Sequence, residues 1–179
     1  MSVATAKVIA KSKSMVSDTE ITTFEIEFPR IILAEFNTHR MISKNASSSR
    51  AIPANSVLER LKDSPFIPEY WGKNQSGMQA GEKLEGHDRS LAESNWIRSI
   101  DEAIKTTKYL QDIGLHKQLT NRISEPFQTV KMVATATEWN NFFWLRNHVD
   151  AQPEMQALAQ AMWGATKEVD GVSLKPGEW

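Results

Sequence analysis

Apolar and polar residues alternate in two segments near the N-terminus. Residues 3–11 alternate, and residues 20–28 do so more regularly, with Phe24, Ile26 and Phe28 on one face. A period of two predicts strands, and the short gap between the segments favours antiparallel pairing. Pro29 suits the first turn of a helix, and the bunched apolar residues over 31–36 are expected to continue it.

The rest of the chain is mostly helical in pattern. Apolar residues at helical spacing predict a helix that begins with a Ser90–Glu93 capping box and ends near Gly114. Further elements are predicted as follows: short helices over 55–62 and 115–122, a strand over 127–136, a helix over 138–147 capped by Thr137, and a last helix over about 152–169 capped by Asp150. Residues 41–50 are predicted to form a loop, residues 64–86 a long irregular loop, and the tail after residue 170 shows no period.

This order of elements predicts an α+β protein. Strands come first, then helices, one more strand and more helices, so we expect a small antiparallel or mixed sheet packed with helices. A length of 179 residues suits a single domain over residues 1–179. The hydrophobic fraction of 40% is sufficient for one core.

Composition narrows the classes of function. The net charge of -1, from 21 basic and 22 acidic residues, argues against binding to a nucleic acid polymer. The absence of cysteine excludes disulfides, thiolate zinc sites and a cysteine nucleophile. No histidine lies at metal-ligand spacing, so we predict no metal site. Without a secretory signal or a run of about 18 apolar residues, we expect a cytoplasmic protein that does not enter the membrane.

The segment THRMISKNASSSR, residues 38–50, is the most unusual part of the sequence. Hydroxyl, amide and guanidinium donors occupy most of its positions. Such donors suit phosphate oxygens, because charge-assisted and bidentate hydrogen bonds are strong. The alternative is a solvated serine-rich loop with surface arginines, and composition alone favours that alternative.

Two blocks of residues resemble the flavin-dependent thymidylate synthases, the ThyX family. The family signature RHRxxSxNxxSxR is matched at six of its seven specified positions; Thr38 replaces its first arginine. The matching residues are His39, Arg40, Ser43, Asn45, Ser48 and Arg50. The second block comprises Arg122, Pro126, Asn141, Leu145, Arg146, Ala151, Gln152 and Glu154. Two blocks in the right order are more specific than either alone, and they favour a ThyX-like fold and a nucleotide site over the solvated loop.

The resemblance implies a homotetramer with FAD and nucleotide at subunit interfaces. It implies methylation of dUMP to dTMP, with methylenetetrahydrofolate and NADPH as cosubstrates. The cofactor-binding residues would be His39, Arg40, Met41 and Asn141. The nucleotide would be bound by Glu35, Ser48, Ser49, Arg50, Arg122 and Arg146, with the Ser48–Arg50 end gripping the nucleotide of a neighbouring subunit. Ser48 and Arg146 are the expected catalytic residues, since Arg146 would stabilise negative charge on the pyrimidine ring.

Four further expectations concern the base, catalytic activity, chain length and aromatic packing. Glu35 stands where the family usually has glutamine, and an ionised carboxylate accepts but does not donate, so dCMP methylation or hydroxymethylation is an alternative to dUMP methylation. A non-catalytic nucleotide-binding homologue is the other alternative. The chain stops at Trp179, short of typical family length, so it is either a compact variant or lacks a C-terminal part. The aromatic run Trp139, Phe142, Phe143 and Trp144 is expected in the core or an interface.

Overall fold

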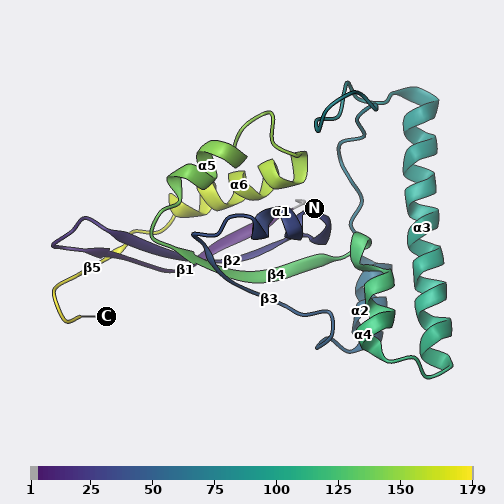
Figure 1. Cartoon of the computed structure of the whole chain (residues 1–179), viewed down its shortest axis with the longest axis horizontal. Helices are drawn as coiled ribbons and strands as arrows, with labels where there is room; N and C mark the ends of the chain where they lie inside the picture. Colours follow the sequence, from purple (N-terminus) through teal and green to yellow (C-terminus); the bar gives the residue numbers. More distant parts are fainter. Residues whose placement is uncertain (1–3, 179) are drawn as a thin grey trace. The chain divides into compact units, whose positions relative to one another are not determined.

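The computed structural model describes residues 4–178, which divide into two compact units. The first comprises residues 4–28, 32–46 and 130–178, and the second comprises residues 29–31 and 47–129. Each unit holds part of the predicted chemistry. Figure 1 shows the elements in the order in which they follow along the chain.

A five-stranded sheet forms the first unit, with strand order β3-β4-β2-β1-β5. Its strands are β1 (Thr5–Ser14), β2 (Glu20–Pro29), β3 (Ser43–Ala46), β4 (Thr129–Ala136) and β5 (Val172–Leu174). β1 pairs antiparallel with β2, β3 pairs antiparallel with β4, and β5 runs parallel to β1. The predicted mixed sheet within an α+β fold is therefore confirmed. Residue 3, the start of the first predicted strand, lies outside the described residues.

The core of the first unit lies between the sheet and two helices. Phe24, Ile26 and Phe28 of β2 are fully buried, as the alternation predicted. Helices α5 (Asn140–Arg146) and α6 (Pro153–Thr166) lie over this sheet (Figure 1), and α6 contributes Met155, Leu158, Ala159 and Met162 to the core. Burying one such side chain stabilises the fold by about 1.5–3 kcal/mol.

Aromatic side chains extend this core toward α5. Trp139, Phe142 and Phe143 are buried, and the Trp139 and Phe142 rings meet edge to face with centroids 5.9 Å apart. Trp144, the fourth residue of the run, is 75% exposed. The expectation of core packing is confirmed for three of the four, and the buried three anchor the helix that carries Arg146.

The second unit is helical. It contains α2 (Ala54–Asp63), α3 (Gly86–Asp112), α4 (Lys117–Ile123) and the short 3-10 helix η2 (Glu125–Phe127). Ile100, Ala103 and Thr107 are the buried positions of α3, the long helix drawn in teal in Figure 1. Residues 64–85 contain no helix or strand, although the backbones of Gly72 and Lys83 form one isolated bridge.

Several predicted boundaries were wrong, because long-range pairing and local caps override the local pattern. Residues 43–46 were predicted as loop but form β3, since β4 supplies an antiparallel partner. The tail likewise gains β5 by pairing with β1. Pro29 ends β2, and the predicted helix is instead the 3-10 helix η1 (Arg30–Ile32) followed by α1 (Leu33–Asn37).

The predicted caps were also wrong. α3 begins at Gly86, so Ser90 lies within it and its hydroxyl donates to the Gly86 carbonyl. At α5 it is the Glu138 carboxylate, not Thr137, that accepts from the Asn140 N–H, at 2.6 Å. α6 starts with Pro153, so Asp150 does not cap it.

Candidate functional site

Glu35, His39 and Arg146 meet in the first unit. The Arg146 Nη1 lies 2.5 Å from the Glu35 Oε1, and the Arg146 Nε donates to the His39 Nε2 at 2.9 Å. The Arg146 and Glu35 side chains are only 23% and 29% exposed. His39 of the first sequence block and Arg146 of the second therefore meet here beside Glu35, and a partly buried guanidinium is held from two sides.

His39 is held as a neutral acceptor. Burial lowers the pKa of His39 from its ordinary 6.5 to about 4, with smaller contributions from the charges of Arg146 and Lys44. Since Nε2 accepts from Arg146, the proton of the neutral ring is assigned to Nδ1. The imidazole thus adds no positive charge beside Arg146 near neutral pH.

The backbone around His39 is fixed by Lys44 and by aromatic packing. The Lys44 ammonium donates to the carbonyls of His39 at 2.6 Å and Asn37 at 3.2 Å. Burial lowers the pKa of Lys44. The His39 ring meets the buried Phe142 ring nearly perpendicularly, with centroids 5.0 Å apart. The His39 side chain is thereby positioned by β3 and α5 together.

The other residues assigned to the cofactor lie at the surface of the first unit. Arg40, Met41 and Asn141 are exposed, Met41 to 84%. Thr38 replaces the signature arginine and is turned back onto α1, where its hydroxyl donates to the Glu35 carbonyl at 2.7 Å. Thr38 therefore caps the short helix, while its neighbours remain open to a ligand.

The serine-rich end of the signature lies in the second unit. Ser48 and Arg50 are exposed, and the Ser48 hydroxyl accepts from the Arg50 backbone N–H at 3.3 Å. Ser49 is buried, with 2% of its surface exposed, and its hydroxyl donates to the Glu125 Oε1 at 2.7 Å. One serine of this turn thus faces solvent and the next anchors it.

The Glu125 carboxylate also forms ion pairs with two arginines. The Arg30 Nε lies 3.3 Å from its Oε1, and the Arg122 Nη1 lies 3.7 Å from its Oε2. Arg30 is 12% exposed, whereas Arg122 is 54% exposed. The buried Asn121 donates from Nδ2 to the carbonyls of Ser49 at 2.8 Å and Ile52 at 3.0 Å.

Sequence reasoning missed Glu125, Arg30 and Asn121. Only the i, i+3 spacing of Arg122 and Glu125 was a usable signal, because the two other contacts of Glu125 come from distant segments. The structure groups Ser48, Ser49, Arg50 and Arg122 in the second unit, separately from Glu35, His39 and Arg146 in the first.

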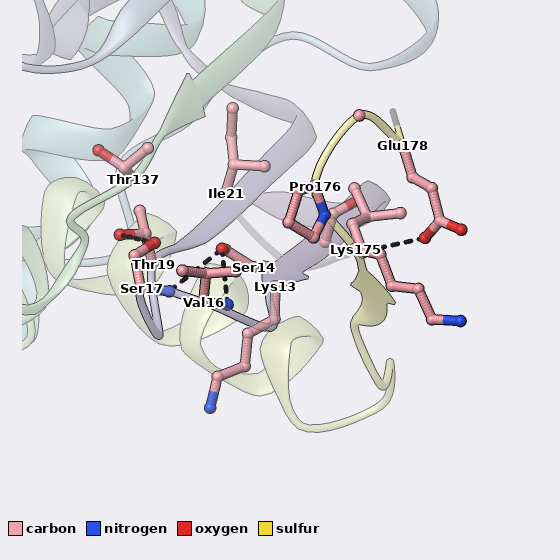
Figure 2. Close-up of a pocket in the computed structure, with 13 residues that line it drawn as sticks. Lys13, Ser14, Val16, Ser17, Thr19, Ile21, Thr137, Lys175, Pro176 and Glu178 are labelled. Atoms are coloured by element: carbon pink, nitrogen blue, oxygen red, sulfur yellow. Dashed lines mark hydrogen bonds between the residues drawn. The ribbon is translucent and has the colours of Figure 1, made fainter.

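A cavity of the first unit lies apart from the predicted site residues. It has a volume of about 640 Å³ and is lined by the β1–β2 hairpin tip and the residues after β5, among them Val16, Ile21 and Pro176 (Figure 2). The Ser14 hydroxyl accepts from the backbone N–H groups of Val16 and Ser17 there. The Ser14 hydroxyl thus stabilises the turn itself, and none of the predicted site residues lines the cavity.

Metal clusters and membrane-spanning helices are both absent from residues 4–178. Within that range, no group of three or more histidine, cysteine or acidic side chains is placed to hold a metal ion. Among the same residues, none of the helices has the length and apolar character needed to cross a bilayer.

The fold and the two clusters define an α+β protein that carries arginines on both of its units. A family model described as thymidylate synthase complementing protein matches residues 5–170, so the chain belongs to this family, the ThyX family. The sequence resemblance is therefore confirmed. A search of curated proteins finds no significant match.

Two solved structures share the fold. The UMP/dUMP methylase PolB from Streptomyces cacaoi, bound with 5-Br UMP, superimposes with a TM-score of 0.72 at 15% identity, covering 98% of this chain and 92% of that one. The same methylase bound with 5-Br dUMP gives a TM-score of 0.73 at 15% identity, covering 97% and 92%. At this identity the likeness shows a common fold.

Proposed function

We propose that this chain methylates a pyrimidine deoxynucleotide, dUMP to dTMP, in a flavin-dependent reaction with methylenetetrahydrofolate and NADPH as cosubstrates. The observation that carries the proposal is the Arg146 guanidinium held between Glu35 and a neutral His39. Family membership supports nucleotide methylation in general, and a similarly folded protein is a UMP/dUMP methylase.

Arg146 would act on the pyrimidine ring. Negative charge develops on the ring oxygens as carbon 5 becomes nucleophilic, and an oriented guanidinium stabilises such charge best where water is partly excluded. Glu35 and His39 contact the Nη1 and Nε of the guanidinium, which leaves the Nη2 N–H groups for a ligand. Because His39 is neutral, its ring does not compete with Arg146 for the developing charge.

The exposed residues of the first unit fit a flavin dinucleotide. The Arg40 guanidinium suits a diphosphate, and the Asn141 amide can both donate to and accept from a ring edge. Neither side chain forms a hydrogen bond or ion pair with another residue in the described part of the chain, so both are available. When bound, a flavin supplies the redox chemistry of the one-carbon transfer, and the protein supplies orientation and charge.

Ser48, Arg50 and Arg122 would bind the nucleotide phosphate. All three are exposed in the second unit, and two guanidinium groups can neutralise a phosphate dianion. We propose that this serine end serves a nucleotide held by a neighbouring subunit of a homotetramer. Light scattering on a size-exclusion column would give the mass of the assembly, and a stable monomer that turns over substrate would contradict the shared arrangement.

Glu35 favours a second candidate, the modification of a cytosine nucleotide. Its carboxylate lies beside Arg146 and can accept from an exocyclic amine. Product mass spectrometry distinguishes the outcomes, because methyl and hydroxymethyl products of dUMP and dCMP all differ in mass.

Flavin and nucleotide binding test the proposal first. Purified protein titrated with FAD is expected to show a bound-flavin absorbance that bleaches on reduction, and dUMP is expected to bind the flavin-loaded protein. A protein that binds nucleotide but no flavin is a non-catalytic homologue. A protein that binds neither contradicts the proposal altogether.

A further inference from the structure

Glu125 is the most highly connected side chain near the serine turn, and the proposed reaction gives it no role. Its two oxygens receive the Ser49 hydroxyl, the Arg30 guanidinium and the Arg122 guanidinium. These three groups come from three separate segments: the serine turn, the 3-10 helix η1 and the last turn of α4. A single carboxylate therefore ties together the elements that present the proposed phosphate ligands.

Burial distinguishes the contacts of this carboxylate. The Glu125 side chain is 23% exposed, and its Oε1 contacts are to the buried Ser49 and to Arg30, which is 12% exposed. Its Oε2 contact to Arg122 is longer, at 3.7 Å, and Arg122 is 54% exposed. Arg30 and Ser49 thus fix the carboxylate, while Arg122 keeps donors free for an external anion.

Charge explains why a carboxylate suits this position. Arg30 and Arg122 would repel each other without an anion between them, and a buried cation without a partner is strongly destabilising. The Ser49 hydroxyl also needs an acceptor, because a buried donor left unsatisfied is costly. Glu125 satisfies all three groups.

We propose that Glu125 is a positioning residue for nucleotide phosphate binding. Through Ser49 it fixes the turn that presents Ser48 and Arg50, and through its second oxygen it orients Arg122. Asn121 fixes the same turn through the Ser49 and Ile52 carbonyls. The turn therefore has two anchors, Asn121 on α4 and Glu125 just after it. This inference rests on the proposed function, since it assumes that the exposed groups bind a nucleotide phosphate.

Two variants distinguish the hydrogen bond to Ser49 from the negative charge of Glu125. Glu125→Gln keeps an acceptor for Ser49 but removes the negative charge, and Ser49→Ala keeps both ion pairs but removes the anchor. Glu102→Gln is the matched control, because Glu102 pairs with Lys105 three residues away on an exposed face of α3 in the same unit. Binding of dUMP and of FAD to each protein is measured by calorimetry, together with the melting temperature.

Both site variants are expected to raise the Kd for dUMP about tenfold or more, as loss of hydrogen bonds to charged groups does. The Kd for FAD is expected to stay within about twofold, and Glu102→Gln is expected to leave both values unchanged. In turnover assays KM for dUMP rises with little change in kcat, because the positioned groups act on binding. If Glu125→Gln does not fold, the dUMP affinity of Ser49→Ala alone tests the positioning role.

Three results would overturn the inference. Tighter dUMP binding by Glu125→Gln would show that the carboxylate competes with phosphate for Arg122. Unchanged dUMP affinity in both variants, with wild type binding dUMP, would remove the positioning role and leave the proposed function intact. Failure of wild type to bind dUMP would remove both.

Discussion

The cluster around Arg146 in the first unit and the cluster around Glu125 in the second use arginine in opposite ways. In the first unit Arg146 is 23% exposed, paired with Glu35 and bonded to His39, against an aromatic core. In the second unit Arg50 and Arg122 face solvent, and the buried charge is that of Arg30 with Glu125. A base edge is read by a few hydrogen bonds at fixed angles, so its donor is held rigidly. A phosphate dianion is attracted from many directions, so its donors can be exposed side chains, with Arg50 on the anchored turn and Arg122 on α4 beside Glu125.

Removal of the rigid guanidinium is expected to have the largest effect. Arg146→Ala should lower kcat by about 100-fold to 1,000-fold, because it deletes an oriented donor to the developing charge. It also leaves Glu35 without its partner, so the melting temperature is expected to fall. Steady-state kinetics measure the first effect, and thermal denaturation measures the second.

The Arg146 effect needs a control for simple loss of charge. Lys131→Ala removes a cation on β4 that is paired with Glu27 at the surface, and it is expected to leave kcat unchanged. Equal losses of kcat in the two variants would mean that Arg146 has no special place in the reaction.

Removal of an exposed guanidinium is expected to act on binding. Arg50→Ala should raise the Kd for dUMP by about 10-fold to 100-fold, which corresponds to about 1.5–3 kcal/mol for a hydrogen bond to a charged group. Its kcat at saturating dUMP should change far less than that of Arg146→Ala. Arg60→Ala, an exposed charge on α2 of the same unit, is the control. Identical dUMP affinity in wild type and Arg50→Ala would contradict the phosphate role.

Glu35 tests whether the rigid cluster selects the base. Glu35→Gln is expected to shift the ratio of kcat/KM for dCMP over dUMP toward dUMP by about tenfold, because an amide can also donate to a carbonyl oxygen. Glu25→Gln, an exposed position on β2, removes the same charge elsewhere in the unit. If wild type and Glu35→Gln share one base preference, the cytosine alternative is removed.

The last expected effect is on stability rather than on turnover, and it is the pH dependence contributed by His39. Its pKa of about 4 in the folded chain lies below the ordinary 6.5, so the unfolded chain binds more protons between these values. The stabilisation is therefore complete above pH 6.5 and is lost as the pH falls toward 4. Denaturation curves of wild type and His39→Asn should diverge less at pH 4 than at pH 7, and parallel curves would refute the neutral buried state of His39.

Much of the fold could be predicted from local pattern. Phe24, Ile26 and Phe28 are buried as their alternation indicates, and β4 and α2 lie close to their predicted positions. β3 could not be predicted, because Ser43–Ala46 is polar and becomes a strand only by pairing with β4. Strand formation at such a position depends on a partner far away in the sequence.

The candidate site divides in the same way. Glu35, His39 and Arg146 could be named from the two sequence blocks, but the bond between Arg146 and His39 spans 107 residues and required the fold. The Glu125 cluster was missed because its contacts to Ser49 and Arg30 come from distant segments, with Ser49 lying 76 residues before Glu125. A motif can be recognised in the sequence, whereas the groups that hold it in place follow from the packing.

The central claim is tested most directly by the product of a complete reaction. Wild-type protein loaded with FAD is incubated with dUMP, methylenetetrahydrofolate and NADPH, and the nucleotide is identified by mass spectrometry. The account predicts conversion of dUMP to dTMP by wild type and severe loss of conversion by Arg146→Ala. Flavin-loaded wild type that alters neither dUMP nor dCMP would contradict it.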